Sequence, residues 1–155
     1  LSKTHGLAGL RIGLGFARAD VIAALMKVKD SYNLNAASQA AAIAALRDGT
    51  YTDAVIAKLV ATRERFGAAL AQRGWRVVPS AANFVLATPP TGAAAELLPR
   101  LERAGYLVRR FDTPRLRDKL RFSMGTAEQM DALLAVLDRL CGGRADRTHT
   151  AAEVG

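Results

Sequence analysis

The hydrophobic positions in the first part of the chain recur mostly at helical spacing. Residues 20–28 form the first such segment, with Asp20 in the N-cap region. Its apolar positions are Val21, Ile22, Leu25 and Val28. Ahead of it, residues 11–17 are apolar and glycine-containing without that spacing, which predicts a short buried strand. The polar run 29–33 interrupts the pattern and predicts a loop.

Two further helices are expected before the pattern changes. Residues 35–47 are very rich in alanine, the strongest helix former, and Gly49 is expected to end that helix. Residues 52–73 are the longest segment with apolar residues at helical spacing, and Gly74 closes it.

After Gly74 the hydrophobic period changes from 3.6 residues to 2, which is typical of strands. Strands are predicted at 75–78, 83–86, 107–109 and 120–124. Helices are predicted at 93–104 and 127–140, and Thr126 with Gln129 resembles a capping box that opens the second of them. This order of elements predicts an α+β fold with a small, mostly antiparallel sheet: helices come first, followed by strand, strand, helix, strand, strand and helix.

Composition is that of a soluble globular protein, with 50% hydrophobic and 23% charged residues. The length of 155 residues suits one domain, alone or with an arm, that buries a real core. The formal charge of +8 fits small anionic ligands, anionic surfaces or an arginine-preferring proteome. The basic residues are spread along the chain without interleaved aromatic residues, so nucleic acid is the weaker interpretation.

Few residues in the chain could build a metal site. Cys141 is the only cysteine, which excludes an internal disulfide and a multi-cysteine metal site. His5 and His149 have no partners at ligand spacing, so no metal is expected. There is no apolar run of the roughly 18 residues that a membrane helix needs, and no signal-peptide pattern at the start. We therefore expect a cytoplasmic protein without a membrane segment. Since residue 1 is not Met, we also expect that the sequence is a fragment or that its first residues are missing.

The first fifteen residues contain the most specific chemistry. Lys3 follows Ser2 and precedes a glycine-rich turn that ends near Arg11. Such an amine can bond to the aldehyde of a phosphorylated cofactor, while the hydroxyl and the guanidinium hold its phosphate. The alternative is a basic surface turn followed by a buried strand.

This stretch resembles the cofactor-lysine segment of the fold type I pyridoxal-phosphate aminotransferases, Ser-Lys-x-x-x-Leu-Ala-Gly-Leu-Arg-x-Gly. Within that family it is most similar to the histidinol-phosphate aminotransferases. The matching positions are Ser2, Lys3, Leu7, Ala8, Gly9, Leu10, Arg11 and Gly13. Three further markers of the family follow in the right order, at residues 83–86, 105–109 and 120–126.

The resemblance implies a domain organisation. Residues 1–50 would be the end of the cofactor-binding large domain, and residues 51–74 an interdomain helix. Residues 75–142 would be the small C-terminal domain. Residues 143–155 are polar and are expected to form a disordered tail.

The resemblance also implies the site residues. Lys3 would bind pyridoxal 5'-phosphate, and Ser2 and Arg11 would hold its phosphate. Arg121, in the middle of an apolar strand, requires a partner. That partner is either the substrate carboxylate or phosphate, which the resemblance favours, or a neighbouring acidic residue in a structural salt bridge. Arg109 would help to bind the phosphate group of the substrate.

Three other positions leave alternatives open. Arg110 competes with Arg109, because neighbouring strand residues face opposite sides, and we favour Arg109. The Tyr32–Asn33 loop either reaches the active site of a neighbouring subunit or is an ordinary polar loop. Cys141 is expected to be a partly buried, inert thiol, because no base lies at recognisable spacing from it.

The function implied is transfer of an amino group between histidinol phosphate and 2-oxoglutarate in histidine biosynthesis, by a homodimer. The alternatives are an aromatic amino-acid aminotransferase and a relative of the threonine-phosphate decarboxylases. In the family, the aspartate on the pyridine nitrogen and the ring-stacking aromatic lie upstream of the lysine segment. We therefore expect the 155 residues alone to be inactive, and a non-catalytic assembly module is a further alternative.

Overall fold

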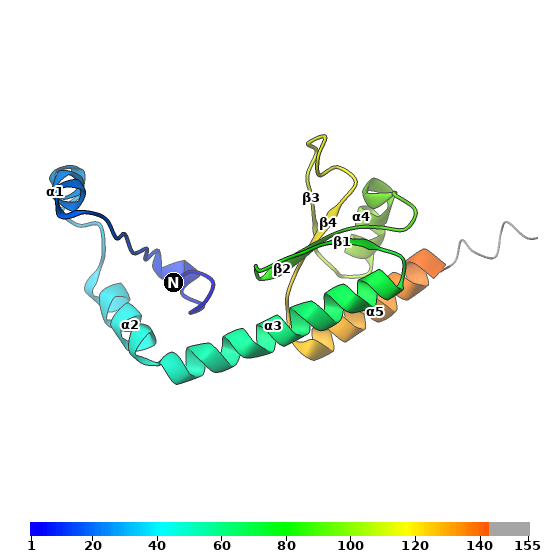
Figure 1. Ribbon diagram of the computed structural model, residues 1–155, viewed down its shortest axis with the longest axis horizontal. Helices are drawn as coiled ribbons and strands as arrows, with labels where there is room; N and C mark the ends of the chain where they lie inside the picture. Colours follow the sequence, from blue (N-terminus) through cyan, green and yellow to red (C-terminus); the bar gives the residue numbers. More distant parts are fainter. Residues whose placement is uncertain (143–155) are drawn as a thin grey trace, which may run out of the picture. The chain divides into compact units, whose positions relative to one another are not determined.

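The computed structural model describes residues 1–142, so the disorder predicted for residues 143–155 lies outside the described residues. Its contacts divide the chain into two compact units, Leu1–Lys58 and Leu59–Gly155. The boundary falls within α3, Gly49–Gln72, which is a single helix of 24 residues (Figure 1).

The first unit contains a 3-10 turn, η1 (Ala8–Leu10), and the helices α1 (Ala19–Val28) and α2 (Ala36–Arg47). The prediction of a strand over residues 11–17 is wrong, because no strand lies in the described part of this unit to pair with it. Without a ladder, its backbone groups are left to solvent. Ile12 is the one buried residue of that run, whereas Leu14 and Phe16 are exposed.

Helix α1 begins one residue earlier than expected, and its N-cap is Arg18 rather than Asp20. Asp20 lies in the first turn, where it pairs with the Arg18 guanidinium at 2.6 and 3.1 Å. An acidic side chain in the first turn interacts favourably with the helix dipole. The Arg18 hydrogen bonds also hold the pKa of Asp20 below its ordinary value.

The junction between α2 and α3 differs from the prediction in one residue's role. Gly49 does not end α2, which stops at Arg47; it is the first residue of α3. Asp48 makes this possible, because its carboxylate accepts a hydrogen bond from the Tyr51 backbone N–H at 3.1 Å. The carboxylate therefore satisfies a donor that a helix start leaves free.

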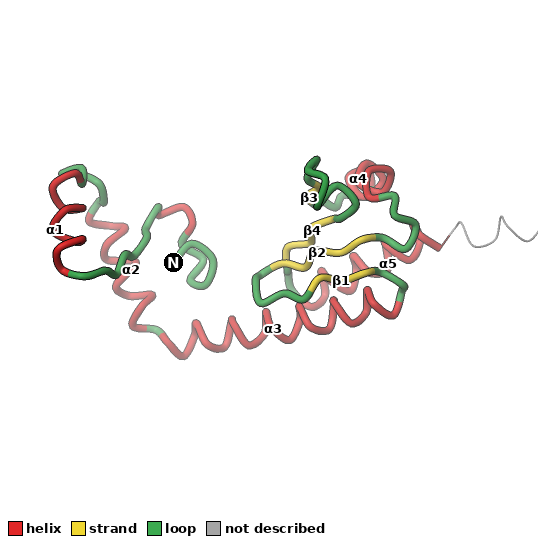
Figure 2. The backbone as a smooth tube through the Cα atoms, turned by 45° about the horizontal axis from the view of Figure 1, so that its top comes forward, coloured by secondary structure: helices red, strands yellow, loops and turns green. Residues whose placement is uncertain are grey.

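The second unit is the predicted α+β arrangement. Four strands form one antiparallel sheet in the order β1-β2-β4-β3, which Figure 2 shows beside the helices. The strands are β1 (Arg76–Val78), β2 (Phe84–Thr88), β3 (Arg109–Arg110) and β4 (Leu120–Ser123). The helices are the second part of α3, α4 (Ala94–Arg103) and α5 (Ala127–Gly142). All four strands lie within two residues of their predicted positions.

One face of the sheet carries the core. Phe122 on β4 is 1% exposed and packs edge-on against Phe66 of α3 and Trp75, with ring centroids 5.6 and 5.8 Å apart. Apolar residues of α4 and α5 join the same cluster. Side chains alternate across a strand, so the neighbours of the core residues project from the opposite face.

Helix α5 begins with the predicted capping box. The Thr126 backbone N–H donates to Gln129 Oε1 at 2.9 Å, and the Gln129 backbone N–H donates to Thr126 Oγ1 at 3.3 Å. The helix continues two residues beyond its predicted end, to Gly142.

Candidate active site

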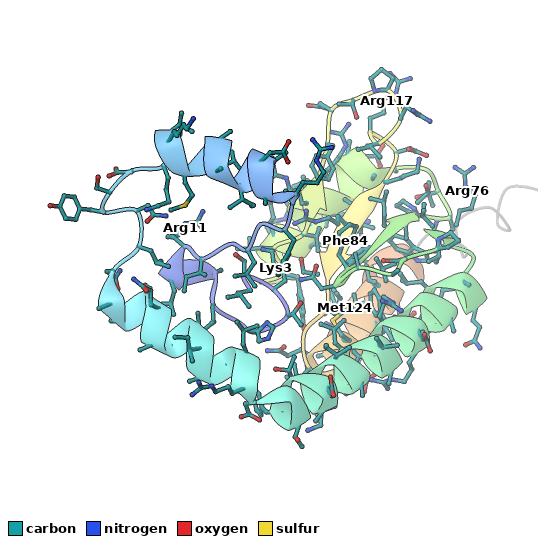
Figure 3. The ribbon with its side chains drawn as sticks, turned by 60° about the vertical axis from the view of Figure 1, so that its left-hand side comes forward. Lys3, Arg11, Arg76, Phe84, Arg117 and Met124 are labelled. Carbon is teal, nitrogen blue, oxygen red and sulfur yellow. The ribbon has the colours of Figure 1, made fainter. Side chains whose placement is uncertain are left out.

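Lys3 lies in a tight turn of the first unit (Figure 3). The Leu1 carbonyl accepts hydrogen bonds from the backbone N–H groups of His5 and Leu7, both at 3.3 Å. Gly6, with φ of 68°, supplies the left-handed conformation that the turn requires. Lys3 is exposed, so its amine is accessible to a ligand.

Ser2 and Arg11 belong to the same unit as Lys3. Ser2 is half-buried and Arg11 is exposed. Arg11 ends η1 in the left-handed region, with φ of 55°, and its Nη1 donates to the Ala8 carbonyl at 3.0 Å. That bond ties the guanidinium to its own turn and leaves further N–H groups for an anion. The three residues of the predicted cofactor group thus sit on one folded segment of eleven residues.

His5 packs at the junction of α2 and α3. Its imidazole lines a cavity of about 230 Å³ together with Ala44, Ala45, Asp48, Tyr51 and Thr52. Within residues 1–142, its buried Nδ1 has no hydrogen-bond partner. His5 therefore packs against the α2–α3 junction, and no hydrogen bond within residues 1–142 fixes its Nδ1.

Arg109 and Arg121 form a pair in the second unit. They are register partners on β3 and β4, so their side chains share the sheet face opposite the core. Arg109 is exposed and Arg121 is half-buried. Within the described residues neither guanidinium pairs with a carboxylate, and the buried Nε of Arg121 has no acceptor. The structural salt bridge considered for Arg121 is therefore not seen among these residues.

Arg110 projects from the other side of β3 and is used within its own hairpin. Its Nε donates to the Arg117 carbonyl at 2.9 Å, and its Nη1 pairs with Asp112 at 2.7 Å. Its register partner is Leu120, which is fully buried. Arg109, without such partners in residues 1–142, is the arginine of the two that can meet a ligand.

Two phenylalanines complete a cluster that sequence reasoning missed. The Arg121 Cζ lies 5.2 Å from the ring centroid of Phe84 and 6.0 Å from that of Phe111. The Arg109 Cζ lies 5.1 Å from the Phe111 ring. We call Phe84, Arg109, Phe111 and Arg121 the arginine face. The sequence did carry a sign of it, because Phe111 follows Arg109 by two residues and so shares its side of the strand.

The Tyr32–Asn33 loop extends from the first unit into solvent. The Tyr32 side chain is 95% exposed, and its backbone N–H donates to Asp30 Oδ1 at 3.0 Å. The Asn33 amide accepts from Lys29 Nζ at 3.1 Å. The loop is thus fixed at its base and presents an aromatic ring at its tip.

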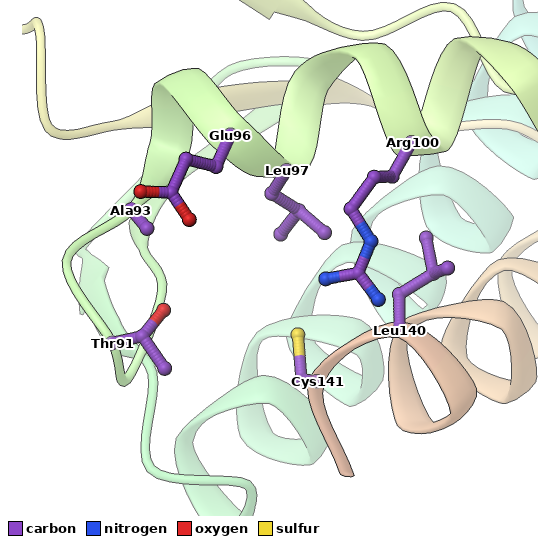
Figure 4. Close-up of a pocket in the computed structure, with 7 residues that line it drawn as sticks. All are labelled: Thr91, Ala93, Glu96, Leu97, Arg100, Leu140 and Cys141. Carbon is purple, nitrogen blue, oxygen red and sulfur yellow. The ribbon is translucent and has the colours of Figure 1, made fainter. Parts of the chain in front are cut away.

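Cys141 faces α4 from the end of α5 and is half-buried, as predicted. Figure 4 shows its sulfur beside Arg100, with Thr91 and Glu96 lining the same small pocket. Burial raises the pKa of the Cys141 thiol, and the Arg100 charge opposes that shift. Such a thiol is protonated and weakly reactive at neutral pH.

Residues 1–142 contain neither a candidate metal site nor a candidate membrane span. No group of three or more His, Cys, Asp or Glu side chains in that range could hold a metal ion. No helix there combines the length and the apolar character that crossing a membrane requires. The chemistry available is therefore that of an accessible amine in one unit and paired guanidinium groups in the other.

Comparison with known proteins agrees with this chemistry. The family model for aminotransferase class I and II matches residues 1–137. The histidinol-phosphate aminotransferase of Citrifermentans bemidjiense is 43% identical over 143 residues, which are 92% of this chain and 41% of that protein. The chain therefore spans about two fifths of the length of the curated relatives it matches.

Solved structures give the same family. The histidinol-phosphate aminotransferase of Sinorhizobium meliloti in complex with pyridoxal-5'-phosphate aligns with a TM-score of 0.82 and 33% identity, over 91% of this chain and 39% of that one. The L-threonine-O-3-phosphate decarboxylase of Porphyromonas gingivalis aligns with a TM-score of 0.74 and 26% identity, over 90% and 44%. The family match covers most of the chain, and these alignments confirm the predicted fold. The chain belongs to the class I and II aminotransferase family, with the fold type I architecture.

Proposed function

We propose that this chain supplies the C-terminal part of the active site of a pyridoxal-phosphate-dependent transaminase. The amino donor would be histidinol phosphate and the acceptor 2-oxoglutarate, in histidine biosynthesis. The observation that carries this proposal is the pairing of Arg109 with Arg121 on one sheet face, without a carboxylate partner in residues 1–142. Two unpaired guanidinium groups side by side suit a doubly charged anion such as a phosphate monoester.

The donor set near the start of the chain fits the cofactor. Lys3 offers an exposed amine for an aldehyde, and Ser2 and Arg11 offer a hydroxyl and a guanidinium for a phosphate. Arg11 spends one N–H on the Ala8 carbonyl and keeps others free to donate. Pyridoxal phosphate would supply an aldehyde that takes up amino groups and a ring that withdraws electrons from the substrate α-carbon.

Each residue then has a defined task. Lys3 Nζ would release the cofactor to an incoming amino substrate and, as a free amine, would remove the proton from the substrate α-carbon. Arg121 and Arg109 would bind the anionic group of the substrate and so orient the bond that breaks. The residues that bind the substrate and the residue that transfers the proton are different. Substitutions of Arg109 or Arg121 should therefore mainly weaken substrate binding, whereas substitution of Lys3 should mainly lower the catalytic rate.

The domain and assembly assignments belong to the same proposal. Residues 1–50 would end the large domain, 51–74 would form the interdomain helix, and 75–142 the small domain. The proposal includes a cytoplasmic homodimer, and its dimer part is supported by the apolar side chains that the first unit exposes. Phe16 is 90% exposed and Tyr32 is 95% exposed, and apolar surface of this kind is usually covered by another chain or domain.

A chemical trapping experiment tests the cofactor lysine. The native enzyme that contains this sequence is incubated with pyridoxal phosphate, reduced with borohydride and digested, and the modified peptide is identified by mass spectrometry. Modification should fall on Lys3 and should be lost in Lys3→Ala but not in Lys27→Ala, since Lys27 is an exposed lysine of α1 in the same unit. Equal labelling of Lys3 and Lys27 would contradict the assignment.

Substrate rates separate this function from a decarboxylase related to the Porphyromonas gingivalis protein. Both would use the arginine pair for a phosphate, so binding alone does not distinguish them. Histidinol phosphate with 2-oxoglutarate should yield glutamate, whereas threonine phosphate should release no carbon dioxide. Phenylalanine in place of histidinol phosphate tests the aromatic aminotransferase alternative. Release of carbon dioxide would replace the proposed function with the decarboxylase.

A further inference from the structure

Phe111 contacts both members of the arginine pair. The Cζ atoms of Arg109 and Arg121 lie 5.1 and 6.0 Å from its ring centroid. Phe84 contacts Arg121 alone, at 5.2 Å. Phe111 is therefore the one aromatic ring in the described residues that both guanidinium groups share.

The arginine face lacks the usual means of fixing a guanidinium. Like charges at opposed strand positions repel each other, and residues 1–142 provide neither a carboxylate for Arg109 or Arg121 nor an acceptor for the buried Arg121 Nε. Hydrogen bonds within these residues therefore do not set the direction of the two side chains. The ring faces of Phe111 and Phe84, which carry partial negative charge, remain as the attractive partners.

The backbone around Phe111 is held firmly enough for the ring to serve this purpose. Phe111 is half-buried and follows directly after the two-residue strand β3. Arg110 ties that strand to the returning chain through the Arg117 carbonyl at 2.9 Å. The ring is thus placed by the hairpin rather than by the arginines it contacts.

We propose that Phe111 is a positioning residue for anion binding. Resting on the proposed function, its role is to stack against Arg109 and Arg121 and to hold both guanidinium groups toward one dianionic group, a phosphate monoester. Phe84 provides Arg121 with a second aromatic contact. Without the ring, the two like charges separate and the anion loses simultaneous contact with both.

The test compares two substitutions of the same ring. Phe111→Leu keeps an apolar side chain but removes the aromatic face, whereas Phe111→Tyr keeps the face. Inorganic phosphate is titrated calorimetrically into the full chain. The dissociation constant should rise about fivefold in Phe111→Leu and stay within about twofold of the original in Phe111→Tyr, given the usual strength of cation–π contacts. An unchanged constant in Phe111→Leu, or equal weakening in both variants, would overturn the inference.

A spectroscopic readout separates positioning from general stability. The Nε–H proton resonance of Arg121 is shifted by nearby ring currents, so it should move toward its random-coil position in Phe111→Leu, without phosphate, and change little in Phe111→Tyr. Urea denaturation of each variant shows whether folding is intact. A resonance that stays in place in Phe111→Leu would contradict the stacking.

Arginine variants distinguish failure of this inference from failure of the proposed function. Arg109→Gln and Arg121→Gln should each weaken phosphate binding by about tenfold or more, because each removes a charged hydrogen-bond donor group. If they leave binding unchanged, the anion site itself is wrong and the proposed function loses its main support. If they weaken binding while Phe111→Leu does not, only the role of Phe111 is wrong.

Discussion

Arg109 and Arg121 lie directly opposite each other on the antiparallel strands β3 and β4. Opposed like charges destabilise a sheet, and Arg121 also buries its Nε without an acceptor among residues 1–142. Groups that weaken the fold in this way are typical of residues retained for binding rather than for stability. The pair thus connects the energetics of the small sheet to the anion site we propose.

The first prediction follows from this relationship. Arg121→Leu should raise the free energy of unfolding by roughly 0.5–1 kcal/mol, because it removes a repulsion and an unsatisfied donor. Arg110→Leu is the matched control on the neighbouring strand, and it should lower that free energy by about 1 kcal/mol, because it loses bonds to Arg117 and Asp112. Urea denaturation measures both. A larger loss of stability in Arg121→Leu than in Arg110→Leu would indicate a structural role for Arg121.

The choice between Arg109 and Arg110 shows how much of the site the sequence could predict. Strand alternation requires that only one of Arg109 and Arg110 share a face with Arg121. Which one does so depends on the register between β3 and β4, and that register is set by the hairpin of residues 111–119. A register shift of one residue would exchange their roles, so the sequence alone favours Arg109 only through the family resemblance.

The strand wrongly predicted over residues 11–17 shows what the sequence could not predict of the fold. Apolar residues and glycines over residues 11–17 match the local pattern of a buried strand, yet a strand requires a partner, and pattern alone does not supply one. Residues 120–124 have a comparable pattern and do form a strand, because β2 pairs with them on one side. Local periodicity therefore predicted elements correctly where a neighbouring element completed the hydrogen bonds.

The second prediction concerns Gly125, which precedes the capping box of α5. A Cβ at this position would collide with the Gln129 amide oxygen and would lie 3.3 Å from its Cβ and Cδ. Gly125→Ala should therefore displace Gln129 and lower the free energy of unfolding by about 1 kcal/mol, the usual contribution of a helix cap. Thermal denaturation followed by circular dichroism measures this loss.

A double-mutant cycle checks the reason for that loss. In a Gln129→Ala background the obstruction is absent and the cap is already weakened, so Gly125→Ala should cost only a few tenths of a kcal/mol more. Additive effects of the two substitutions would mean that Gly125 matters for its backbone conformation and not for the space it leaves to Gln129.

The third prediction concerns the ion pair between α3 and α5. Arg73 binds Asp138 through two bonds, at 2.6 and 2.9 Å, and these hold the pKa of Asp138 below its ordinary value of 3.8, although burial acts to raise it. Since the folded pKa is the lower one, the stabilisation is present above pH 3.8 and is lost as the pH falls through the folded pKa. Asp138→Asn should therefore reduce stability at pH 7, and the reduction should shrink as the pH falls below 3.8.

The size of that effect should be modest. Arg73 is 33% exposed and Asp138 is 50% exposed, so solvent screening limits the pair to at most about 1 kcal/mol. Asp131→Asn is the control, because Asp131 pairs with Arg65 across the same helices through one contact of 2.7 Å between Oδ1 and Nη1. It should change stability by about half as much or less. Urea midpoints at pH 7 and pH 2 measure both variants, and an Asp138→Asn effect of the same size at both pH values would show that the charge is not its cause.

The last prediction concerns the reactivity of Cys141. Burial raises the pKa of its thiol, the Arg100 charge lowers it, and the Asp138 charge raises it again. Because the thiolate is the reactive form, modification by a disulfide reagent at pH 8 should be about tenfold or more slower in the folded chain than in urea. Arg100→Gln should slow the reaction further, since it removes the charge that favours the thiolate. Arg103 is an exposed arginine on the same helix α4 that does not line the pocket, so Arg103→Gln should leave the rate unchanged. A faster reaction in Arg100→Gln would mean that Arg100 acts by covering the sulfur rather than by its charge.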